Sequence, residues 1–168
     1  MTDRDSEHRA LLDQLACKTL HDTYSYAEIV RDADLLAGIF TDDGVWGEAR
    51  GREAVRAQAL AFFELMAPLA SLRIAPAGWH VDVDGDTAVG RFFVTATNKV
   101  VAPDGGERIV VCDADYHVEF ARTDEGWRIA VMRGPVGTQL PHDSTLQGEM
   151  PSVPIDFGMG EVRREAYS

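Results

Sequence analysis

The amino-acid sequence predicts an α+β domain in which N-terminal helices pack against one strongly curved antiparallel sheet and enclose a mostly apolar pocket. Three observations support this prediction. Helical periodicity dominates up to about residue 67, a period of two replaces it from Trp79 onward, and short Gly-containing turns separate the later strands. Helices followed by hairpin-linked strands are typical of α+β proteins, and turns this short join antiparallel strands.

Three segments in the first part of the chain suit helices. Residues 7–26 place apolar and small side chains on one face, and residues 32–40 form a second, short helix that the turn at 41–44 closes. Residues 52–67 form an amphipathic helix. Residues 45–48, between the last two helices, predict a short strand.

Four strands follow, at about residues 79–84, 88–101, 109–122 and 127–133. The third strand alternates clearly between an acidic face and an apolar face, and the apolar side chains are those of Val110, Cys112, Ala114, Tyr116, Val118 and Phe120. Residues 1–133 are therefore predicted to form the pocket domain. The Gly- and Pro-rich residues 134–168 form a C-terminal tail, which packs on the same domain or on a partner subunit.

Composition excludes several classes of function. The 168 residues carry a net charge of −12, which disfavours nucleic-acid and anionic membrane partners because both require clustered basic side chains. The charged N-terminus does not resemble a signal peptide, and no apolar run is long enough to span a membrane, so we expect a cytoplasmic protein. Cys17 and Cys112 alone form neither a disulfide scaffold nor a zinc site.

Several segments together resemble the SnoaL-like branch of the nuclear-transport-factor-2-like superfamily, which contains polyketide cyclases and dehydratases. These segments are Tyr24, Leu35–Trp46, Gly51–Arg56, Val83–Ala88 and Phe120–Ile129, in the order and at the spacing of the family. The resemblance covers about residues 11–133. It implies a cone-shaped sheet whose concave face and first helices line a deep pocket, and a homodimer packed through the outer sheet face.

The acid–base pair of dehydratases with this fold has no counterpart at the matching positions. The resemblance places the aspartate of that pair at Ile29, and it places the histidine in residues 74–78, which contain none. Glu28 is the neighbouring carboxyl group, but it points about 100° away from Ile29 on an ideal helix. We expect Glu28 on a solvated helix face and His21, which shares a stripe with Ser25 and Glu28, at the surface.

The candidate catalytic residues are therefore Glu48, Tyr24 and Tyr116. Glu48 lies two residues beyond Trp46 on a strand expected to line the pocket, where loss of solvation would raise its pKa and suit it to act as a base. The two tyrosine hydroxyls would donate hydrogen bonds to an oxyanion. The predicted substrate-binding residues are Phe40, Trp46, Phe63, Met66, Trp79, Phe92 and Arg133.

Two classes of function remain open. The first is a cofactor-independent lyase, isomerase or cyclase that acts on a small apolar molecule of aromatic or polyketide type. The second is a non-catalytic small-ligand-binding or accessory protein of the same fold, which the missing acid–base pair would favour. Nucleotide-binding glycine loops and converging metal ligands are absent from the sequence, so we expect neither a cofactor nor a metal ion.

Overall fold

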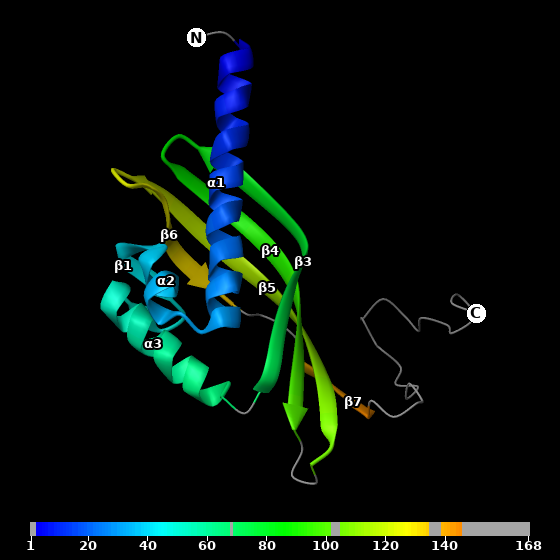
Figure 1. The fold of residues 1–168 in the computed structure, drawn as a ribbon. Coiled ribbons are helices and arrows are strands. Elements are labelled where there is room, and N and C mark those ends of the chain that lie inside the picture. The colour runs from blue at the N-terminus through cyan, green and yellow to red at the C-terminus, as the bar shows by residue number, and fades with distance from the viewer. Residues whose placement is uncertain (1–2, 68, 102–104, 135–138, 146–168) are drawn as a thin grey trace, which may run out of the picture.

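The computed structural model describes residues 3–67, 69–101, 105–134 and 139–145 (Figure 1). The predicted order is confirmed, with three helices and a short strand region between the last two of them, followed by the long strands. In chain order the elements are α1 (Asp3–Val30), α2 (Ala33–Gly38), β1 (Phe40–Trp46), β2 (Ala49–Arg50), α3 (Arg52–Leu65), β3 (Leu69–Asp84), β4 (Thr87–Val101), β5 (Glu107–Thr123), β6 (Gly126–Arg133) and β7 (Gln139–Thr145).

The strands form one sheet in the order β2-β1-β6-β5-β4-β3, and β7 also pairs with β5. All neighbours are antiparallel except β1 and β6, which run parallel. β1 already begins at Phe40, so the prediction of a turn at residues 41–44 is wrong. A register irregularity between Phe40 and Val45 accommodates these turn-forming residues within the β1–β6 pair.

β3 is ten residues longer at its N-terminal end than the sequence predicted, because Pro76 and Gly78 disguise the start of the strand. The register of β3 against β4 shifts between these two residues. β3 is also the last strand in the sheet order, and an edge strand or a bulge tolerates proline because no ladder hydrogen bond is required there.

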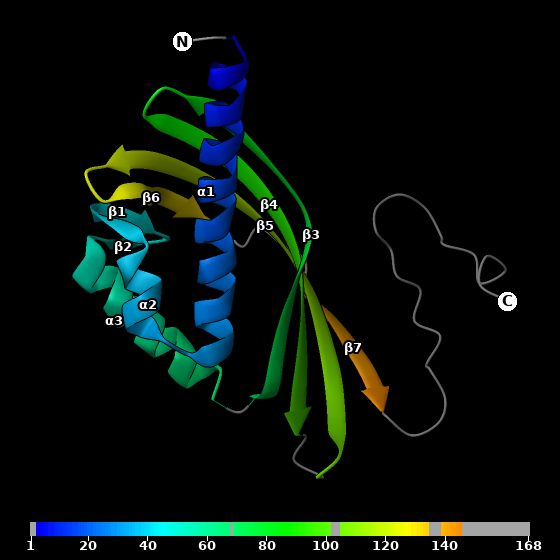
Figure 2. The ribbon, with the colours of Figure 1, turned by 45° about the horizontal axis from the view of Figure 1, so that its top comes forward.

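The three helices lie on the concave side of the curved sheet, as predicted (Figures 1 and 2). α1 crosses this face, and Gln14 on it donates a hydrogen bond of 3.1 Å to the carbonyl oxygen of Val81 in β3. Asp32 caps the N-terminus of α2, because its side chain accepts a 2.9 Å hydrogen bond from the Leu35 amide. The far ends of β3, β4 and β5 extend beyond the helices, next to β7 (Figure 2).

A polar cluster fixes the N-terminal half of α1 to the sheet. The Asp13 carboxylate accepts hydrogen bonds from Arg122 at 2.7 Å and from the Trp127 indole at 2.9 Å. Arg122 also binds Asp86 at 3.0 Å, and its guanidinium lies 4.4 Å from the centre of the Trp127 ring. These contacts set the rotation of α1 about its own axis and so decide which of its side chains face the sheet.

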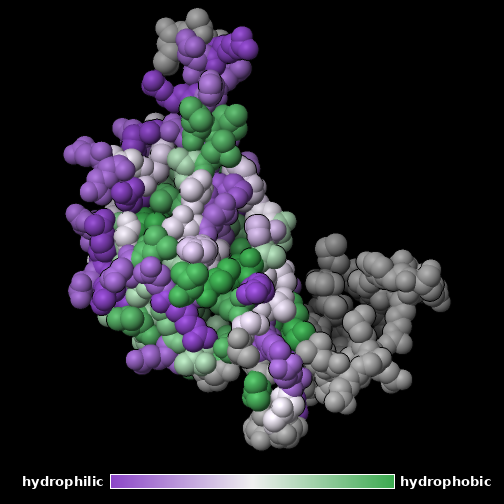
Figure 3. All heavy atoms as spheres, in the orientation of Figure 1, coloured by the Kyte–Doolittle hydropathy of each residue, from purple (hydrophilic) through white to green (hydrophobic). Residues whose placement is uncertain are grey.

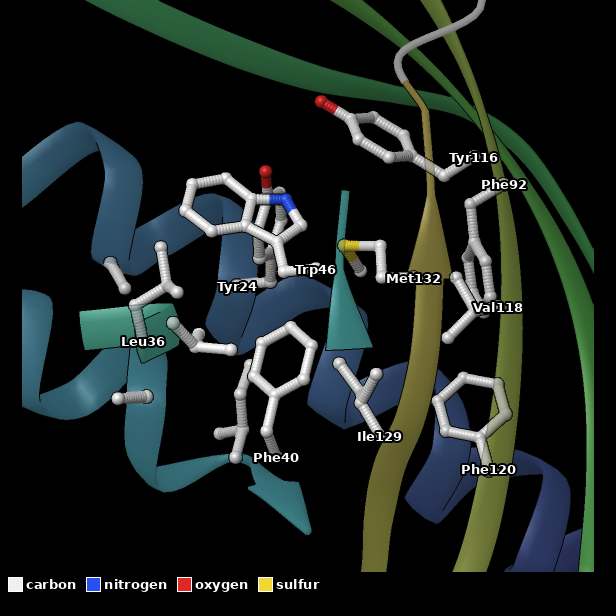
Figure 4. Close-up of a cluster of buried hydrophobic side chains, with 14 of the residues drawn as sticks. Tyr24, Leu36, Phe40, Trp46, Phe92, Tyr116, Val118, Phe120, Ile129 and Met132 are labelled. Atoms are coloured by element: carbon white, nitrogen blue, oxygen red, sulfur yellow. The ribbon is translucent and has the colours of Figure 1, made fainter. Parts of the chain in front are cut away.

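Apolar side chains from the helices and the concave face meet in one core (Figure 4). Leu36 and Phe40 contribute from α2 and β1, while Phe92, Phe120 and Ile129 contribute from the sheet. Some apolar residues of α1 remain at the surface, among them leucines 11, 12 and 15. Figure 3 shows hydrophobic surface over the upper part of this helix.

The structure also bears on the expectations about membrane spans and the C-terminal tail. In the part of the chain that the structure describes, no helix has the length and apolarity of a membrane span. Residues 139–145 of the predicted tail pair with β5 of the same chain. Residues 135–138 and 146–168 of the tail lie outside the described residues.

Replacing Gly90 with alanine is expected to destabilise the protein by about 1–3 kcal/mol, because the concave face has no room for another methyl group. A Cβ atom at Gly90 would lie 2.6 Å from a ring carbon of Phe92 and 3.0 Å from a ring carbon of Phe120. Gly38→Ala is the matched control, since nothing lies within 4 Å there, and it should not destabilise. Urea unfolding of both variants measures the difference, and equal stabilities would contradict this packing.

Candidate active site

A stripe of polar side chains on α1 faces into the core. His21, Tyr24 and Glu28 follow one another at helical spacing, and only 2%, 1% and 6% of their surfaces are exposed. The expectation that His21 and Glu28 lie at the protein surface is therefore wrong. The packing of α1 turns this stripe toward the sheet, while Ile29, at the family's aspartate position, is only half-buried.

Glu28 and Tyr24 form a buried pair. The Tyr24 hydroxyl donates a 2.7 Å hydrogen bond to Glu28 Oε1. Burial raises the pKa of Glu28 to about 7, although the hydrogen bond from Tyr24 acts in the opposite direction. The same burial, together with the nearby Glu28 charge, raises the pKa of Tyr24 well above its usual value. Near neutral pH the Glu28 carboxyl group can therefore both accept and release a proton.

Tyr116 projects from β5 toward this pair. Its ring meets the Tyr24 ring edge to face, with centroids 5.6 Å apart, and the two hydroxyl groups lie on the same side of the cluster (Figure 4). Burial, followed by the Glu28 charge, raises the pKa of Tyr116, so the hydroxyl stays protonated and can donate a hydrogen bond. The predicted inward orientation of Tyr24 and Tyr116 agrees with their burial.

His21 lies one helical turn before Tyr24, and its ring is near the rings of both tyrosines. Its imidazole stacks on Phe92 at a centroid distance of 4.2 Å and an angle of 6°, and it meets the edge of Tyr116 at 5.4 Å. Burial lowers the pKa of His21 to about 4, so the ring is neutral near pH 7. Its Nε2 atom has no hydrogen-bond partner among the described residues.

Aromatic side chains surround these polar groups. Trp46 of β1 meets Tyr24 at 5.8 Å and Phe62 of α3 at 6.2 Å. Of the predicted substrate-binding residues, the buried ones are Phe40, Trp46, Phe63 and Phe92, whereas Met66 is half-buried. Trp79 pairs with Phe92 across β3 and β4 and is 38% exposed, so it lies where the concave face meets solvent.

Two predicted site residues lie elsewhere. Glu48 is exposed in the turn between β1 and β2, so its predicted place on the inner face of a strand is wrong. β1 ends at Trp46, and Gly47 begins the turn with a φ of +58°, which breaks the alternation on which the prediction relied. Arg133 is exposed and forms an ion pair with Glu119, opposite His117 on the outer face, and so does not line the site.

The other ionisable clusters are structural or lie on the outer face. Arg91 holds Asp115 through paired hydrogen bonds, and His80 lies 3.1 Å from Asp82. Among the described residues, no three His, Cys, Asp or Glu side chains are arranged to hold a metal ion. Glu28, Tyr24, Tyr116 and His21 therefore form a cluster of ionisable side chains that the fold brings together inside the core.

The fold and this arrangement define a helix-covered, curved-sheet domain, and the chain belongs to the SnoaL-like domain family. The family model matches residues 9–133, which contain all of the site described above. This family lies within the nuclear-transport-factor-2-like superfamily, as the sequence resemblance indicated. Among curated protein sequences, no match to the chain is found.

Solved structures agree with the family assignment. A nuclear-transport-factor-2-like protein with a cystatin-like fold from Novosphingobium aromaticivorans is 26% identical, with a TM-score of 0.63 over 79% of this chain and 86% of that chain. A putative aromatic ring hydroxylase from the same species is 25% identical, with a TM-score of 0.59 over 76% and 94%. A protein of unknown function from Mycobacterium tuberculosis is 26% identical, with a TM-score of 0.61 over 83% and 78%.

Glu28 and His21 are expected to affect the pH dependence of stability in opposite directions. Because the pKa of Glu28 rises from 4.5 to about 7 on folding, the native protein binds more protons in this range, and stability falls as pH rises through it. Because the pKa of His21 falls from 6.5 to about 4, stability falls as pH decreases through that range. In the unmodified protein the two slopes oppose each other.

Urea unfolding at a series of pH values separates the two contributions. In Glu28→Gln the free energy of unfolding should rise from pH 4 to 6.5, and in His21→Phe it should fall from pH 4.5 to 7. Each slope is at most about 1.4 kcal/mol per pH unit. Glu48→Gln, at an exposed position, should keep the profile of the unmodified protein. Identical profiles in all variants would show that neither group titrates abnormally.

Proposed function

We propose that the protein is a cofactor-independent acid–base enzyme, a lyase, isomerase or cyclase, that acts on a small aromatic or polyketide-like molecule. The observation that supports this most strongly is the buried Glu28 carboxyl group, whose pKa of about 7 suits proton transfer near neutrality. Tyr24 orients this carboxyl group through the 2.7 Å hydrogen bond. Tyr116 places a second hydroxyl beside the pair.

The proposed chemistry begins with proton abstraction from carbon. The ionised Glu28 takes a proton from the carbon next to a substrate ketone, and the electron pair moves to the ketone oxygen as an enolate. The Tyr116 hydroxyl donates a hydrogen bond to that oxygen, which stabilises the negative charge in an environment of low polarity. All three reaction types in the proposal share this first step.

The fate of the enolate distinguishes the three reaction types. In a β-hydroxy ketone, the enolate collapses to a conjugated double bond, and the departing hydroxyl takes the proton from Glu28 and leaves as water. In an isomerisation, Glu28 returns the proton to a different carbon. In a cyclisation, the enolate carbon attacks a second carbonyl, and the resulting alkoxide takes the proton. In each case Glu28 ends in its starting state.

The aromatic surroundings support an aromatic substrate. Trp46, Phe62 and Phe92 present ring faces and edges around the polar groups, and such walls favour flat apolar molecules. The putative aromatic ring hydroxylase among the similar structures is described as acting on an aromatic ring. We adopt only this substrate class from it, because the proposed reaction rests on Glu28 and the two tyrosines of this chain.

We also propose that the protein acts as a homodimer that packs through the outer sheet face. Val89 and Phe93 of β4 are exposed there, on the side opposite the helices. The neighbouring Arg91–Asp115 ion pair would be covered by such an interface, with the charges of each subunit already paired.

Glu28→Gln is expected to reduce turnover by about a hundredfold or more, because the amide cannot accept the proton. Tyr116→Phe should reduce it by about a hundredfold through loss of the oxyanion donor. The assay follows conversion of a panel of β-aryl-β-hydroxy ketones to conjugated enones by ultraviolet absorbance. Glu48→Gln is the control and should keep full activity, since Glu48 lies in an exposed turn.

Each result of this assay has a distinct meaning. Full activity in Glu28→Gln would overturn the proposed mechanism, and loss of activity in Glu48→Gln alone would restore the original assignment of the base. Binding of the panel without any turnover would instead favour the alternative function, a non-catalytic ligand-binding protein.

Tyr24→Phe is expected to shift the pH–rate profile to higher pH rather than abolish activity. The hydrogen bond from Tyr24 lowers the pKa of Glu28, so its loss should raise that pKa above about 7. The rate depends on the ionised carboxylate, and the acidic limb of the profile should therefore shift to higher pH. A profile with an unchanged midpoint would show that Tyr24 does not act on Glu28.

A further inference from the structure

From the geometry we infer that His21 contacts the ligand directly and that its Nε2 atom forms a hydrogen bond with a hydroxyl group on an aromatic molecule. This inference deepens the proposed function and rests on its substrate class. It adds that the ligand carries a second oxygen group, apart from the ketone that would lie near Glu28 and Tyr116. His21 thereby becomes a residue that determines specificity.

The first support is the state of the imidazole. His21 is 2% exposed, and its Nε2 atom is buried without a hydrogen-bond partner among the described residues. A buried polar atom left without a hydrogen-bond partner destabilises the folded protein. A phenylalanine would fill the same space against Phe92 without that cost, so the nitrogen requires an explanation other than packing.

The second support is the set of neighbours. The imidazole has the Phe92 ring stacked on it at 4.2 Å, the Tyr116 ring edge-on at 5.4 Å and the Tyr24 ring at 6.1 Å. The Tyr24 hydroxyl is already directed to Glu28. These rings surround His21 with flat apolar surfaces, and an aromatic ligand beside them would have its polar substituent next to Nε2.

The third support is the spacing of polar groups along α1. His21 and Glu28 are seven residues apart, which corresponds to about 10 Å along a helix axis. Tyr24 lies between them on the same stripe of the helix, and the side chains of His21, Tyr24 and Glu28 are all buried. A fused-ring molecule with oxygen groups at both ends spans such a distance, whereas a single small ring does not.

The concave face is partly exposed to solvent one strand away from the Phe92–His21 stack. Trp79 is the cross-strand partner of Phe92, the residue on which the imidazole stacks, and it is 38% exposed. A ligand entering beside Trp79 would therefore meet the Phe92–His21 stack one strand further in.

A hydroxyl group suits His21 better than other polar groups. A neutral imidazole carries its proton on one nitrogen, and Nε2 is a donor in one tautomer and an acceptor in the other. The lowered pKa keeps His21 neutral near pH 7. A hydroxyl both donates and accepts, so it pairs with either tautomer, while a cationic or anionic group would enter an apolar site at a high desolvation cost.

The test compares naphthol with methylnaphthalene, which replaces the hydroxyl with a methyl group of similar size. Calorimetry should show that the unmodified protein binds naphthol about tenfold more tightly than methylnaphthalene. His21→Phe retains the stack on Phe92 and should bind both probes equally. His21→Gln, which restores a polar group, should regain part of the preference. Glu48→Gln, at an exposed position in the turn between β1 and β2, is the control and should keep the preference.

A direct measurement uses the unmodified protein labelled with nitrogen-15 in its five histidines. The His21 signal, identified by its absence in His21→Phe, should shift with naphthol and stay unchanged with methylnaphthalene. The inference would be overturned if the naphthol preference persists in His21→Phe, or if the His21 signal does not shift when naphthol is added. Failure of naphthol to bind would overturn it as well.

The outcomes separate this inference from the proposed function. Glu28→Gln should lose turnover of the ketone panel but keep the naphthol preference, because its His21 is intact. If the preference depends on His21 and no ketone is turned over, the ligand contact stands and the catalytic proposal falls. If turnover depends on Glu28 and His21→Phe leaves the naphthol preference unchanged, only the inference about His21 falls.

Discussion

The burial of the Glu28 carboxyl group against Tyr24 is the interaction on which the rest of the site depends. A carboxyl group removed from water favours its protonated form, and a hydrogen bond from a hydroxyl partly restores the ionised form. The balance of these two effects brings the pKa close to neutrality. Because α1 is fixed at its other end through Asp13 and Arg122, the helix cannot rotate to release Glu28 into solvent without losing those contacts.

The polar groups inside the core avoid the cost of buried charge in different ways. His21 stays neutral, Tyr24 and Tyr116 remain protonated, and Glu28 alone changes its charge near pH 7. The outer face of the sheet differs from the core because it carries charged side chains, which form ion pairs such as Arg91–Asp115 in contact with water. The curved sheet therefore separates an outer face with paired, hydrated charges from an interior in which a buried carboxyl group titrates near neutral pH.

Much of the fold could be predicted because periodicity reports directly on burial. The alternation in β5 assigned Tyr116 to the inner face and His117 to the outer face, and both assignments agree with the structure. The start of β3 was missed, because Pro76 is incompatible with a central strand and its edge position depends on the order of strands in the sheet. Strand order is a long-range property that local patterns do not contain.

The sequence by itself determined the class of fold, the family, the inner faces of the strands and the placement of Tyr24 within the core. Only the tertiary structure decided which carboxyl group joins Tyr24. Glu48 follows Trp46 at strand spacing, but the chain turns at Gly47 and leaves it in solvent. Glu28 looked like a surface residue because a helix shows its buried stripe only after packing fixes its rotation, and the contacts of Asp13 with Arg122 and Trp127 set that rotation.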